Sequence, residues 1–367
     1  MRVGVPKEIK NNEYRVGLTP PSVAELVAAG HEVVVETEAG SGIDFDDQDY
    51  VEAGARILAK AAEIFAQSDM IVKVKEPQPQ EIALLEPRHL LFTYLHLAPD
   101  PEQAHGLMKS GATCIAYETV TARDGSLPLL KPMSEVAGRM SIQVGAHYLE
   151  KEQGGRGVLL GGVPGVSPVK VAILGGGVAG VNAAQMAVGM RADVTIYDIS
   201  NTRLAELDMF FGSQIKTVYA SKAAIASAVQ SAALVIGAVL VPGAAAPKLV
   251  TREMLRTMKR GSVLVDIAID QGGCFETSHA TTHENPVYEV DGVIHYCVGN
   301  MPGAVARTSA FALNNATLPF AVKLANLGAD AAMKADPHLA DGLNVMSGKI
   351  RHQAVAEALG LEYVAFQ

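Results

Sequence analysis

The chain contains no tryptophan, and aromatic residues make up only 5% of its 367 positions. Proteins that bind nucleic acid commonly stack bases on aromatic side chains or present a dense basic face. The formal net charge is −9, and the sequence has no dense run of Lys and Arg. These two shortages lead us to expect no nucleic-acid partner.

Cysteine is also scarce. Cys114, Cys274 and Cys297 are far apart and odd in number, so they show neither a disulfide framework nor the spacing of metal ligands. The N-terminal run MRVGVPKEIK is charged too early to be a signal peptide. We therefore expect a reducing, cytoplasmic location.

Long uniformly apolar runs are lacking as well. Residues 223–247 carry no charge, but they include Ser227, Gln230, Pro242 and Gly243. A membrane-spanning helix needs about 20 predominantly apolar residues, and the apolar middle of this segment, ALVIGAV, is only as long as a buried strand. We expect a helix end, a strand and a loop here, and no membrane association.

The sequence does contain a repeated alternation of short apolar runs with helical patterns. The strands expected before residue 120 are RVGVP, HEVVVET, DMIVKVK, HLLFTYL and TCIAYETV. After a loop at residues 154–168, a second series follows with VKVAILG, DVTIYD, KTVYA, ALVIGAV, SVLVDIA and IHYCVG. Strands that alternate with helices form right-handed crossovers and parallel sheets. The sequence therefore predicts an α/β protein with two doubly wound parallel sheets.

The two series define the expected domains. Ser134 is expected to be the N-cap of a long helix that begins the second series. The roughly 60 residues after Pro302 are too few for a third core, so we expect them to pack on the first domain. This predicts a discontinuous first domain, residues 1–133 and 303–367, with a second domain, residues 134–302, inserted into it.

A glycine-rich motif, LGGGVAG, follows the strand VKVAIL and opens a helix. Gly175, Gly177 and Gly180 form the pattern G-x-G-x-x-G, and Asp198 lies 18 residues further on, at the end of the strand DVTIYD. Together these features are the fingerprint of a Rossmann dinucleotide-binding domain. The alternative is a glycine-rich turn that holds nothing, and the register of strand, helix and acid disfavours it.

The acid of this fingerprint favours NAD. Asp198 is expected to accept hydrogen bonds from the adenosine ribose, and its charge repels the 2′-phosphate of NADP. Arg203 lies nearby and could pair with that phosphate, although we expect it to lie along the adenosine. A solvated helix position remains the alternative for Arg203.

Several polar residues are expected at the carboxyl ends of strands, where ligands of open α/β sheets bind. Lys75 ends DMIVKVK, His96 follows HLLFTYL, and Arg15 lies in the loop after RVGVP. In the second domain Asp270 follows SVLVDIA, and Asn300 and Met301 follow IHYCVG. Asp266, inside the strand, is interpreted as structural.

These residue types suit the oxidation of an amino acid. Arginine pairs bidentately with a carboxylate, and Lys75 could bind the carboxylate or polarise a keto oxygen. His96 could move protons near neutral pH, and Asp270 could stabilise a positively charged nitrogen. Each residue has a simpler alternative: Arg15 and Lys75 as surface charges, His96 as a structural histidine, and Asp270 as a turn cap or a cofactor contact.

Six runs, PKEIKNNEYRVGLTP, KVKEP, YLHLA, LGGGVAG, VDIAIDQGG and VGNMPGAV, closely resemble the alanine dehydrogenase family, in order and across nearly the whole chain. The resemblance implies NAD as cofactor, L-alanine, pyruvate and ammonium as substrates, and a homohexamer. It also implies a substrate-binding first domain with Arg15 and Lys75, and catalytic roles for His96 and Asp270. The cofactor contacts that it implies are Ser134, Val178, Asp198, Arg203, Val239, Leu240, Ile267, Val298 and Met301.

Two positions depart from the family pattern. Ala220 stands where many members have a serine that contacts NAD, and Lys323 stands where some carry a glutamate proposed to bind a divalent ion. We therefore expect no metal. Two rival functions remain open: a dinucleotide-binding subunit of proton-translocating transhydrogenase, and a saccharopine-type or opine-type dehydrogenase with a larger substrate.

Overall fold

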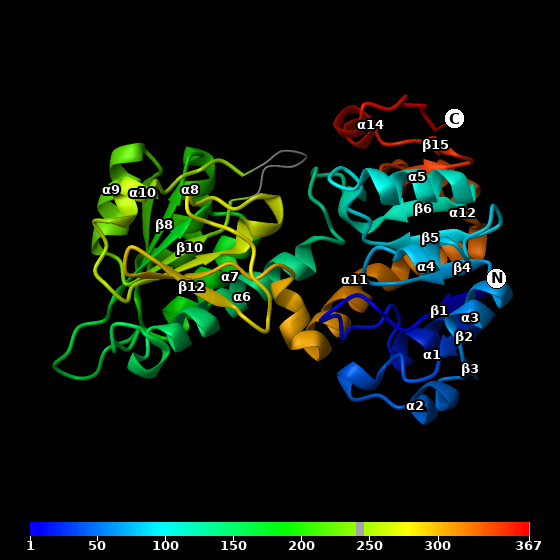
Figure 1. The fold of residues 1–367 in the computed structure, drawn as a ribbon, viewed down its shortest axis with the longest axis horizontal. Coiled ribbons are helices and arrows are strands. Elements are labelled where there is room, and N and C mark those ends of the chain that lie inside the picture. Colours follow the sequence, from blue (N-terminus) through cyan, green and yellow to red (C-terminus); the bar gives the residue numbers. More distant parts are fainter. Residues whose placement is uncertain (240–245, 367) are drawn as a thin grey trace. The chain divides into compact units, whose positions relative to one another are not determined.

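The computed structural model describes residues 1–239 and 246–366, and the chain divides into two compact units. Unit 1 comprises Met1–Met133 and Gly303–Gln367, and unit 2 comprises Ser134–Pro302. Figure 1 shows the two units as separate sheets flanked by helices. Each unit is described by itself below.

Unit 1 is built on an eight-stranded sheet. Its strands are β1 (Arg2–Val5), β2 (Glu32–Glu36), β3 (Arg56–Leu58), β4 (Met70–Val72), β5 (Leu90–Thr93), β6 (Thr113–Ala116), β14 (Leu343–Met346) and β15 (Lys349–Ile350). Its helices are α1 (Pro20–Ala28), α2 (Asp47–Glu52), α3 (Ala61–Gln67), α4 (Pro79–Ile82), α5 (Pro101–Ser110), α11 (Ala306–Leu327), α12 (Ala329–Ala335), α13 (Pro337–Ala340) and α14 (Gln353–Leu359), with short 3-10 turns η1 (Ser41–Ile43) and η2 (Tyr117–Thr119).

The strand order of unit 1 is β15-β14-β6-β5-β4-β1-β2-β3. Strands β1 to β6 are all parallel, whereas β14 pairs antiparallel with β6 and β15 antiparallel with β14. The order reverses between β1 and β4, which makes the carboxyl ends of these two strands the switch point where doubly wound sheets bind ligands.

The C-terminal tail of the chain shares the core of unit 1. Ile350, Val355 and Ala356 pack with Leu91 and Cys114 of the parallel strands. Figure 1 shows this orange-to-red segment alongside the cyan strands β5 and β6. Burial of its apolar side chains against the earlier strands explains why the last 65 residues (Gly303–Gln367) belong to unit 1.

Unit 2 contains a seven-stranded sheet in the order β12-β13-β11-β10-β7-β8-β9. Its strands are β7 (Lys170–Leu174), β8 (Asp193–Asp198), β9 (Lys216–Tyr219), β10 (Leu234–Gly237), β11 (Val263–Asp266), β12 (Val287–Val290) and β13 (Val293–Tyr296). Its helices are α6 (Lys131–Tyr148), which begins in unit 1, α7 (Val178–Gly189), α8 (Asn201–Phe211), α9 (Lys222–Ser231) and α10 (Arg252–Leu255), with 3-10 turns η3 (Lys151–Gln153), η4 (Gly212–Gln214), η5 (Ile267–Gln271) and η6 (Met301–Val305).

Both sheets therefore have the doubly wound architecture that the sequence predicts, and the fold class is confirmed. In unit 2 all strands are parallel except β12, which pairs antiparallel with β13. The order reverses between β7 and β10, so the glycine-rich turn after β7 lies at the switch point. The strands β3, β12, β14 and β15 were not predicted from the sequence.

The start of the long helix differs from the prediction. Ser134 was expected to be its N-cap, but α6 begins at Lys131, so Ser134 lies inside the helix. Pro132 explains the earlier start, because proline is well tolerated in the first turn, where its missing N–H is not needed. The strand DMIVKVK is also shorter than predicted, since β4 ends at Val72.

A buried ion-pair cluster holds the loop that follows β4. Lys73 is fully buried, and its Nζ lies 2.7 Å from Glu81 Oε1 and 3.2 Å from Glu8 Oε2. Burial lowers the pKa of Lys73, but the two carboxylates outweigh it and raise the pKa overall. Burial raises the pKa of Glu8. The cluster is stable only with its cation in place.

We predict that Lys73→Met destabilises the protein, because it leaves Glu8 and Glu81 buried without a counter-charge. Breaking a buried pair by removing one partner typically costs about 3–5 kcal/mol. Urea unfolding measures the loss. The matched control is Lys7→Met, which removes an exposed ion pair with Glu38 and should change stability by less than about 1 kcal/mol. Equal stability of the two variants would contradict the prediction.

Candidate functional site

In unit 1 the polar residues singled out from the sequence follow β1, β4 and β5, at the carboxyl edge of the sheet. Arg15 lies in the loop after β1, Lys75 three residues after β4, and His96 three residues after β5. These three strands lie close together in the sheet order β5-β4-β1. The three residues therefore follow strands on both sides of the switch point.

Arg15 is almost completely buried, so the surface-charge alternative is wrong for it. Its Nε and Nη2 donate to the carboxylate of Glu13 at 2.7 and 2.6 Å, and the Glu13 carboxylate also accepts the backbone N–H of Arg15. Burial lowers the pKa of Arg15, but Glu13 outweighs it and raises the pKa. The guanidinium is thus a permanent cation whose position is set by Glu13.

Lys75 is partly buried in the loop after β4. Its carbonyl accepts the Thr93 hydroxyl at 2.9 Å, which ties it to β5. The preceding residue, Val74, donates its N–H to Glu8 Oε1 at 2.6 Å. The loop that presents Lys75 is therefore anchored to the buried cluster of Glu8, Lys73 and Glu81.

His96 has a left-handed backbone conformation, with φ of 49°. Its side chain is 45% exposed and its ring stacks on Tyr94, with ring centroids 5.7 Å apart and nearly parallel planes. Tyr94 is buried, its hydroxyl donates to Leu129 O, and burial raises its pKa. His96 is therefore neither a buried core histidine nor a freely mobile surface side chain.

The glycine-rich turn of unit 2 has the geometry that a dinucleotide requires. Gly175 has φ of 104°, and a Cβ on Gly180 would lie 1.9 Å from Gly175 O, so α7 packs directly on the turn. A Cβ on Gly177, in contrast, would meet no heavy atom within 4 Å. The first and third glycines are thus needed by the fold, whereas the second leaves open space next to the backbone.

Asp198 and Arg203 both contact this turn. Asp198 accepts the N–H groups of Gly176 and Ser200 at 2.7 and 2.8 Å, one on each carboxylate oxygen. Since a carboxylate offers about four lone-pair sites, it can accept further hydrogen bonds. Arg203 donates its Nε to Gly176 O at 2.7 Å and pairs with Glu206, while its side chain stays 37% exposed.

Asp270 lies in η5, directly after β11, and its side chain is exposed with no hydrogen-bond partner among the described residues. A Cβ on Gly299 would lie 3.1 Å from Asp270 Oδ1. The loops after β11 and β13, with Asp270 in one and Asn300 and Met301 in the other, are therefore adjacent. Asp266, not Asp270, caps the turn.

Asp266 is buried and accepts hydrogen bonds from both ends of the loop that carries Asp270. Its carboxylate accepts Ala268 N at 3.1 Å, Cys274 N at 2.9 Å and the Ser278 hydroxyl at 2.5 Å. Burial raises the pKa of Asp266. These contacts agree with its interpretation as a structural residue.

The remaining residues named from the family resemblance also lie in unit 2. Ile267 opens η5 after β11, and Val239 comes two residues after β10. Val298 is fully buried after β13, and Val178 is partly exposed at the start of α7. Ser134 lies in the first turns of α6. Leu240 falls outside the described residues.

Two of the carboxylates described above, Glu8 and Glu13, were not identified from the sequence. Both lie in loops. In each case a buried carboxylate accepts backbone N–H groups of a loop. Such a contact leaves no periodic pattern in the sequence from which it could be predicted.

Lys323 forms an ion pair with Asp336 at 2.6 Å. Among residues 1–239 and 246–366, no group of three His, Cys, Asp or Glu side chains has suitable geometry for a metal. Within the same ranges, no helix is both long and apolar enough to cross a membrane.

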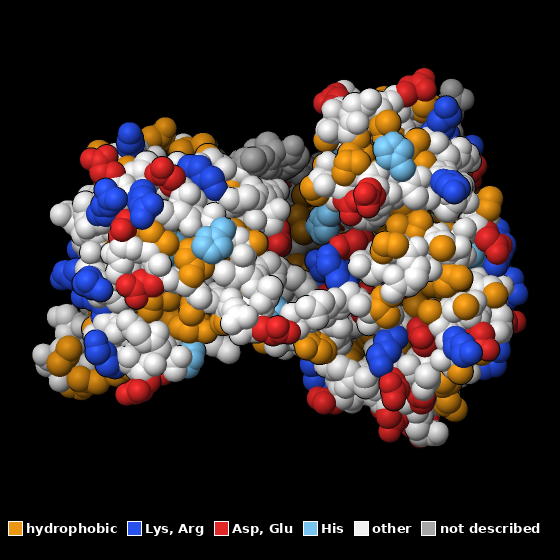
Figure 2. Space-filling view, in the orientation of Figure 1, with side chains coloured by type: hydrophobic (Ala, Val, Ile, Leu, Met, Phe, Trp, Pro, Cys, Tyr) orange, Lys and Arg blue, Asp and Glu red, His pale blue; other side chains and the backbone are white. Residues whose placement is uncertain are grey.

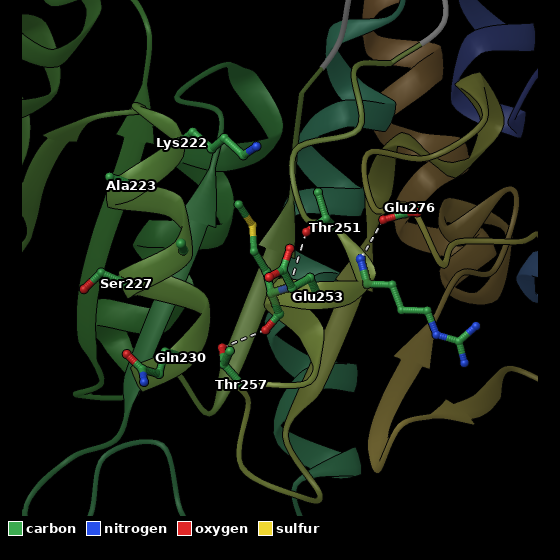
Figure 3. Close-up of a pocket in the computed structure, with 11 residues that line it drawn as sticks. Lys222, Ala223, Ser227, Gln230, Thr251, Glu253, Thr257 and Glu276 are labelled. Atoms are coloured by element: carbon green, nitrogen blue, oxygen red, sulfur yellow. Dashed lines mark hydrogen bonds between the residues drawn. The ribbon is translucent and has the colours of Figure 1, made fainter.

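The surface of unit 2 also has hollows away from these residues. A groove of about 930 Å³ lies between α9 and α10, lined by residues such as Lys222, Thr251 and Glu276 (Figure 3). None of the candidate residues is among those that line it. The groove is therefore assigned no part in the chemistry considered below.

On the face drawn in Figure 2, Lys and Arg are interspersed with Asp and Glu on both units.

Comparisons with known proteins identify the family. Residues 4–137 match the model described as Alanine dehydrogenase/PNT, N-terminal domain, and residues 141–353 match Alanine dehydrogenase/PNT, C-terminal domain. The chain belongs to the alanine dehydrogenase/PNT family. The resemblance found from the six sequence runs is thereby confirmed.

Relatives within this family are similar over the whole chain. An alanine dehydrogenase of Halomonas elongata is 60% identical over 99% of this chain and 98% of its own length. A solved L-alanine dehydrogenase structure matches with a TM-score of 0.95 and 56% identity, covering 98% of this chain and 99% of that one. The transhydrogenase from Sinorhizobium meliloti matches with a TM-score of 0.83 and 29% identity, covering 96% and 100%.

We predict opposite outcomes for alanine substitutions in the glycine-rich turn. Gly180→Ala should lower the melting temperature strongly, because its Cβ would overlap Gly175 O. Gly177→Ala should leave the melting temperature unchanged, because its Cβ meets nothing, yet it should weaken dinucleotide binding by narrowing the backbone approach. Differential scanning fluorimetry and fluorescence titration with NADH measure the two effects. Unchanged NADH binding by Gly177→Ala would show that no dinucleotide approaches this backbone.

Proposed function

We propose that this chain is an NAD-dependent alanine dehydrogenase, which interconverts L-alanine with pyruvate and ammonia by hydride transfer. The observation that carries the proposal is the similarity to alanine dehydrogenases at 60% identity over 99% of the chain. The near-identical fold of the solved L-alanine dehydrogenase supports it.

The family and the dinucleotide-binding fold imply a nicotinamide cofactor, which accepts the hydride from the substrate carbon. The residues of unit 2 fit such a group, since the backbone at Gly177 is open and Gly175 and Gly180 shape the turn. We assign the pyrophosphate to this turn and to the N-terminus of α7. Unit 2 is then the cofactor domain.

We further propose NAD rather than NADP. The Asp198 carboxylate has lone pairs left for ribose hydroxyls, and its negative charge would repel a 2′-phosphate. Arg203 already donates its Nε to Gly176 O and its Nη1 to Glu206, so two of its five N–H donors are used. The other proposed cofactor contacts are Ser134, Val178, Val239, Leu240, Ile267, Val298, Asn300 and Met301.

Unit 1 is proposed to bind the substrate. Arg15 offers a permanent positive charge, fixed by Glu13, to the carboxylate of alanine or pyruvate. Lys75 holds the same carboxylate or polarises the keto oxygen. Because both cations are partly or fully withdrawn from water, their interaction with an anionic substrate is stronger than that of exposed cations.

His96 and Asp270 are proposed to act on the reacting atoms. As hydride leaves the α-carbon, positive charge grows on the substrate nitrogen, and the preplaced anion of Asp270 stabilises it. Water then adds to the resulting iminium carbon, and His96 takes up a proton from that water. Collapse of the carbinolamine releases pyruvate and ammonia.

We also propose that the protein is a cytoplasmic homohexamer. The hexamer follows from the family resemblance. The reducing compartment is supported by Cys114, Cys274 and Cys297, which are all buried free thiols. Light scattering coupled to size-exclusion chromatography measures the subunit number.

We predict that the purified chain reduces NAD with L-alanine as the only other organic substrate. The reaction, alanine with NAD⁺ and water giving pyruvate, ammonium, NADH and a proton, releases one proton, so alanine oxidation should be favoured as pH rises. NADP should be a much poorer cofactor. Absorbance of NADH at a series of pH values, with a panel of amino acids and no membrane present, measures these outcomes. A requirement for a second dinucleotide and a membrane partner would instead favour a transhydrogenase-type subunit.

We predict that Asp270→Asn abolishes most turnover without harming the fold. Loss of an electrostatic element of this kind typically costs about a hundredfold or more in rate. The side chain is exposed and has no hydrogen-bond partner among the described residues, so the melting temperature should not change. Asp266→Asn is the matched control, since it perturbs a buried carboxylate with three acceptor contacts and should lower the melting temperature. Near-normal turnover of Asp270→Asn would remove Asp270 from the reaction.

A further inference from the structure

Glu118 lies in η2, directly after β6, and its carboxylate faces the loop after β5. Its side chain is only 14% exposed. Both carboxylate oxygens lie 3.2 Å from the backbone nitrogen of Leu95, and Oε1 accepts the backbone N–H of His96 at 2.6 Å. A half-buried charge is thus used to bind two consecutive backbone donors of the segment that presents His96.

These contacts stabilise a costly conformation. His96 has φ of 49°, and the left-handed region is unfavourable for a residue with a side chain, because its Cβ crowds the backbone carbonyl oxygen. Hydrogen bonds from backbone N–H groups to a carboxylate are roughly twice as strong as those to neutral acceptors. Glu118 therefore offsets the strain at His96, and without it the loop would relax toward a commoner conformation.

The same carboxylate also lies beside the imidazole ring. Oε1 of Glu118 is 3.9 Å from His96 Nδ1, while Tyr94 stacks on the ring face. Tyr94 is itself fixed by its hydrogen bond to Leu129 O. The backbone of His96 is thus fixed by Glu118, and its ring is stacked on Tyr94 with the Glu118 carboxylate nearby. The exposed part of the ring remains available to a substrate.

We propose that Glu118 is the positioning residue for His96: its carboxylate binds the backbone N–H groups of Leu95 and His96 and so holds the histidine in its left-handed conformation. This inference rests on the proposed function, in which His96 is the base of alanine oxidation. Glu118 itself touches neither substrate nor cofactor in this assignment, so its effect on the reaction passes through His96.

Other titratable groups surround Glu118. Tyr94, the residue after β5, faces it; burial raises the pKa of Tyr94, Arg15 lowers it, and Glu118 adds a smaller rise. His352 faces it from the loop before α14, where burial lowers the pKa of the imidazole while Glu118 and Asp341 oppose that shift. The proposed role of Glu118 requires no change of charge on Tyr94 or His352. Neither residue is therefore varied in the experiment.

The test compares Glu118→Gln, which keeps an oxygen acceptor but removes the charge, with Glu118→Ala, which removes both. We expect kcat for alanine oxidation to fall about tenfold in Glu118→Gln and about a hundredfold in Glu118→Ala, with NADH affinity unchanged. KM for alanine should change less than kcat, because Glu118 acts on the position of the proton acceptor and not on the binding of the substrate.

The matched control is Asp46→Asn. Asp46 is also a carboxylate of unit 1 that accepts a backbone N–H, from Asp49 at 3.1 Å, but it caps α2. It should change the melting temperature slightly and leave kcat unchanged. A carboxylate that only stabilises the fold would behave in the same way at position 118.

A second readout does not depend on activity. The rate at which diethyl pyrocarbonate modifies His96 at a fixed pH, followed by mass spectrometry, reports how its ring is presented, and it should change in Glu118→Ala because the segment is no longer held in one conformation. If the wild-type chain does not oxidise alanine, the proposed function fails, while this rate still tests the role of Glu118. An active wild type with unchanged kcat and modification rate in both variants would overturn the proposal.

Discussion

A carboxylate that accepts backbone N–H groups is the interaction on which the candidate site depends. Glu13 binds Arg15, Glu8 binds the loop of Lys75, Glu118 binds the segment of His96, and Asp266 binds both ends of the loop of Asp270. Loops at the carboxyl ends of parallel strands have backbone donors that the sheet no longer satisfies. An anion satisfies them strongly and leaves the loop in one conformation.

The six parallel strands have the same order in both units, but the units use their switch points differently. In unit 2 the turn after β7 is made of glycine and leaves room for the backbone to approach a ligand, as at Gly177. In unit 1 the loops after β1 and β4 are rich in charge, and Lys73 and Arg15 are buried there with their carboxylate partners. The same scaffold thus offers neutral backbone dipoles in one unit and full charges in the other.

The sequence predicted what depends on periodicity and on motifs. Apolar runs such as VKVAILG and DVTIYD identified the parallel strands, and LGGGVAG identified the turn, because each feature is local. The start of α6 was missed because Ser134 is a good cap in isolation, whereas Pro132 allows the helix to begin a turn earlier. Glu118 and Glu13 could not be assigned, since their hydrogen bonds depend on a backbone path that no local pattern encodes.

Two aspartates of the same loop show how environment separates their roles. Asp266 and Asp270 are four residues apart, and either could have been assigned to the turn or to the chemistry from the sequence alone. Asp266 is buried among Ala268 N, Cys274 N and the Ser278 hydroxyl, and burial raises its pKa. Its hydrogen bonds therefore stabilise the fold. Asp270 is exposed and has no partner among the described residues, so its charge remains available to a substrate nitrogen. Asp266 fixes the conformation of the loop. Asp270 is thereby held in place without using its own carboxylate for hydrogen bonds to the loop.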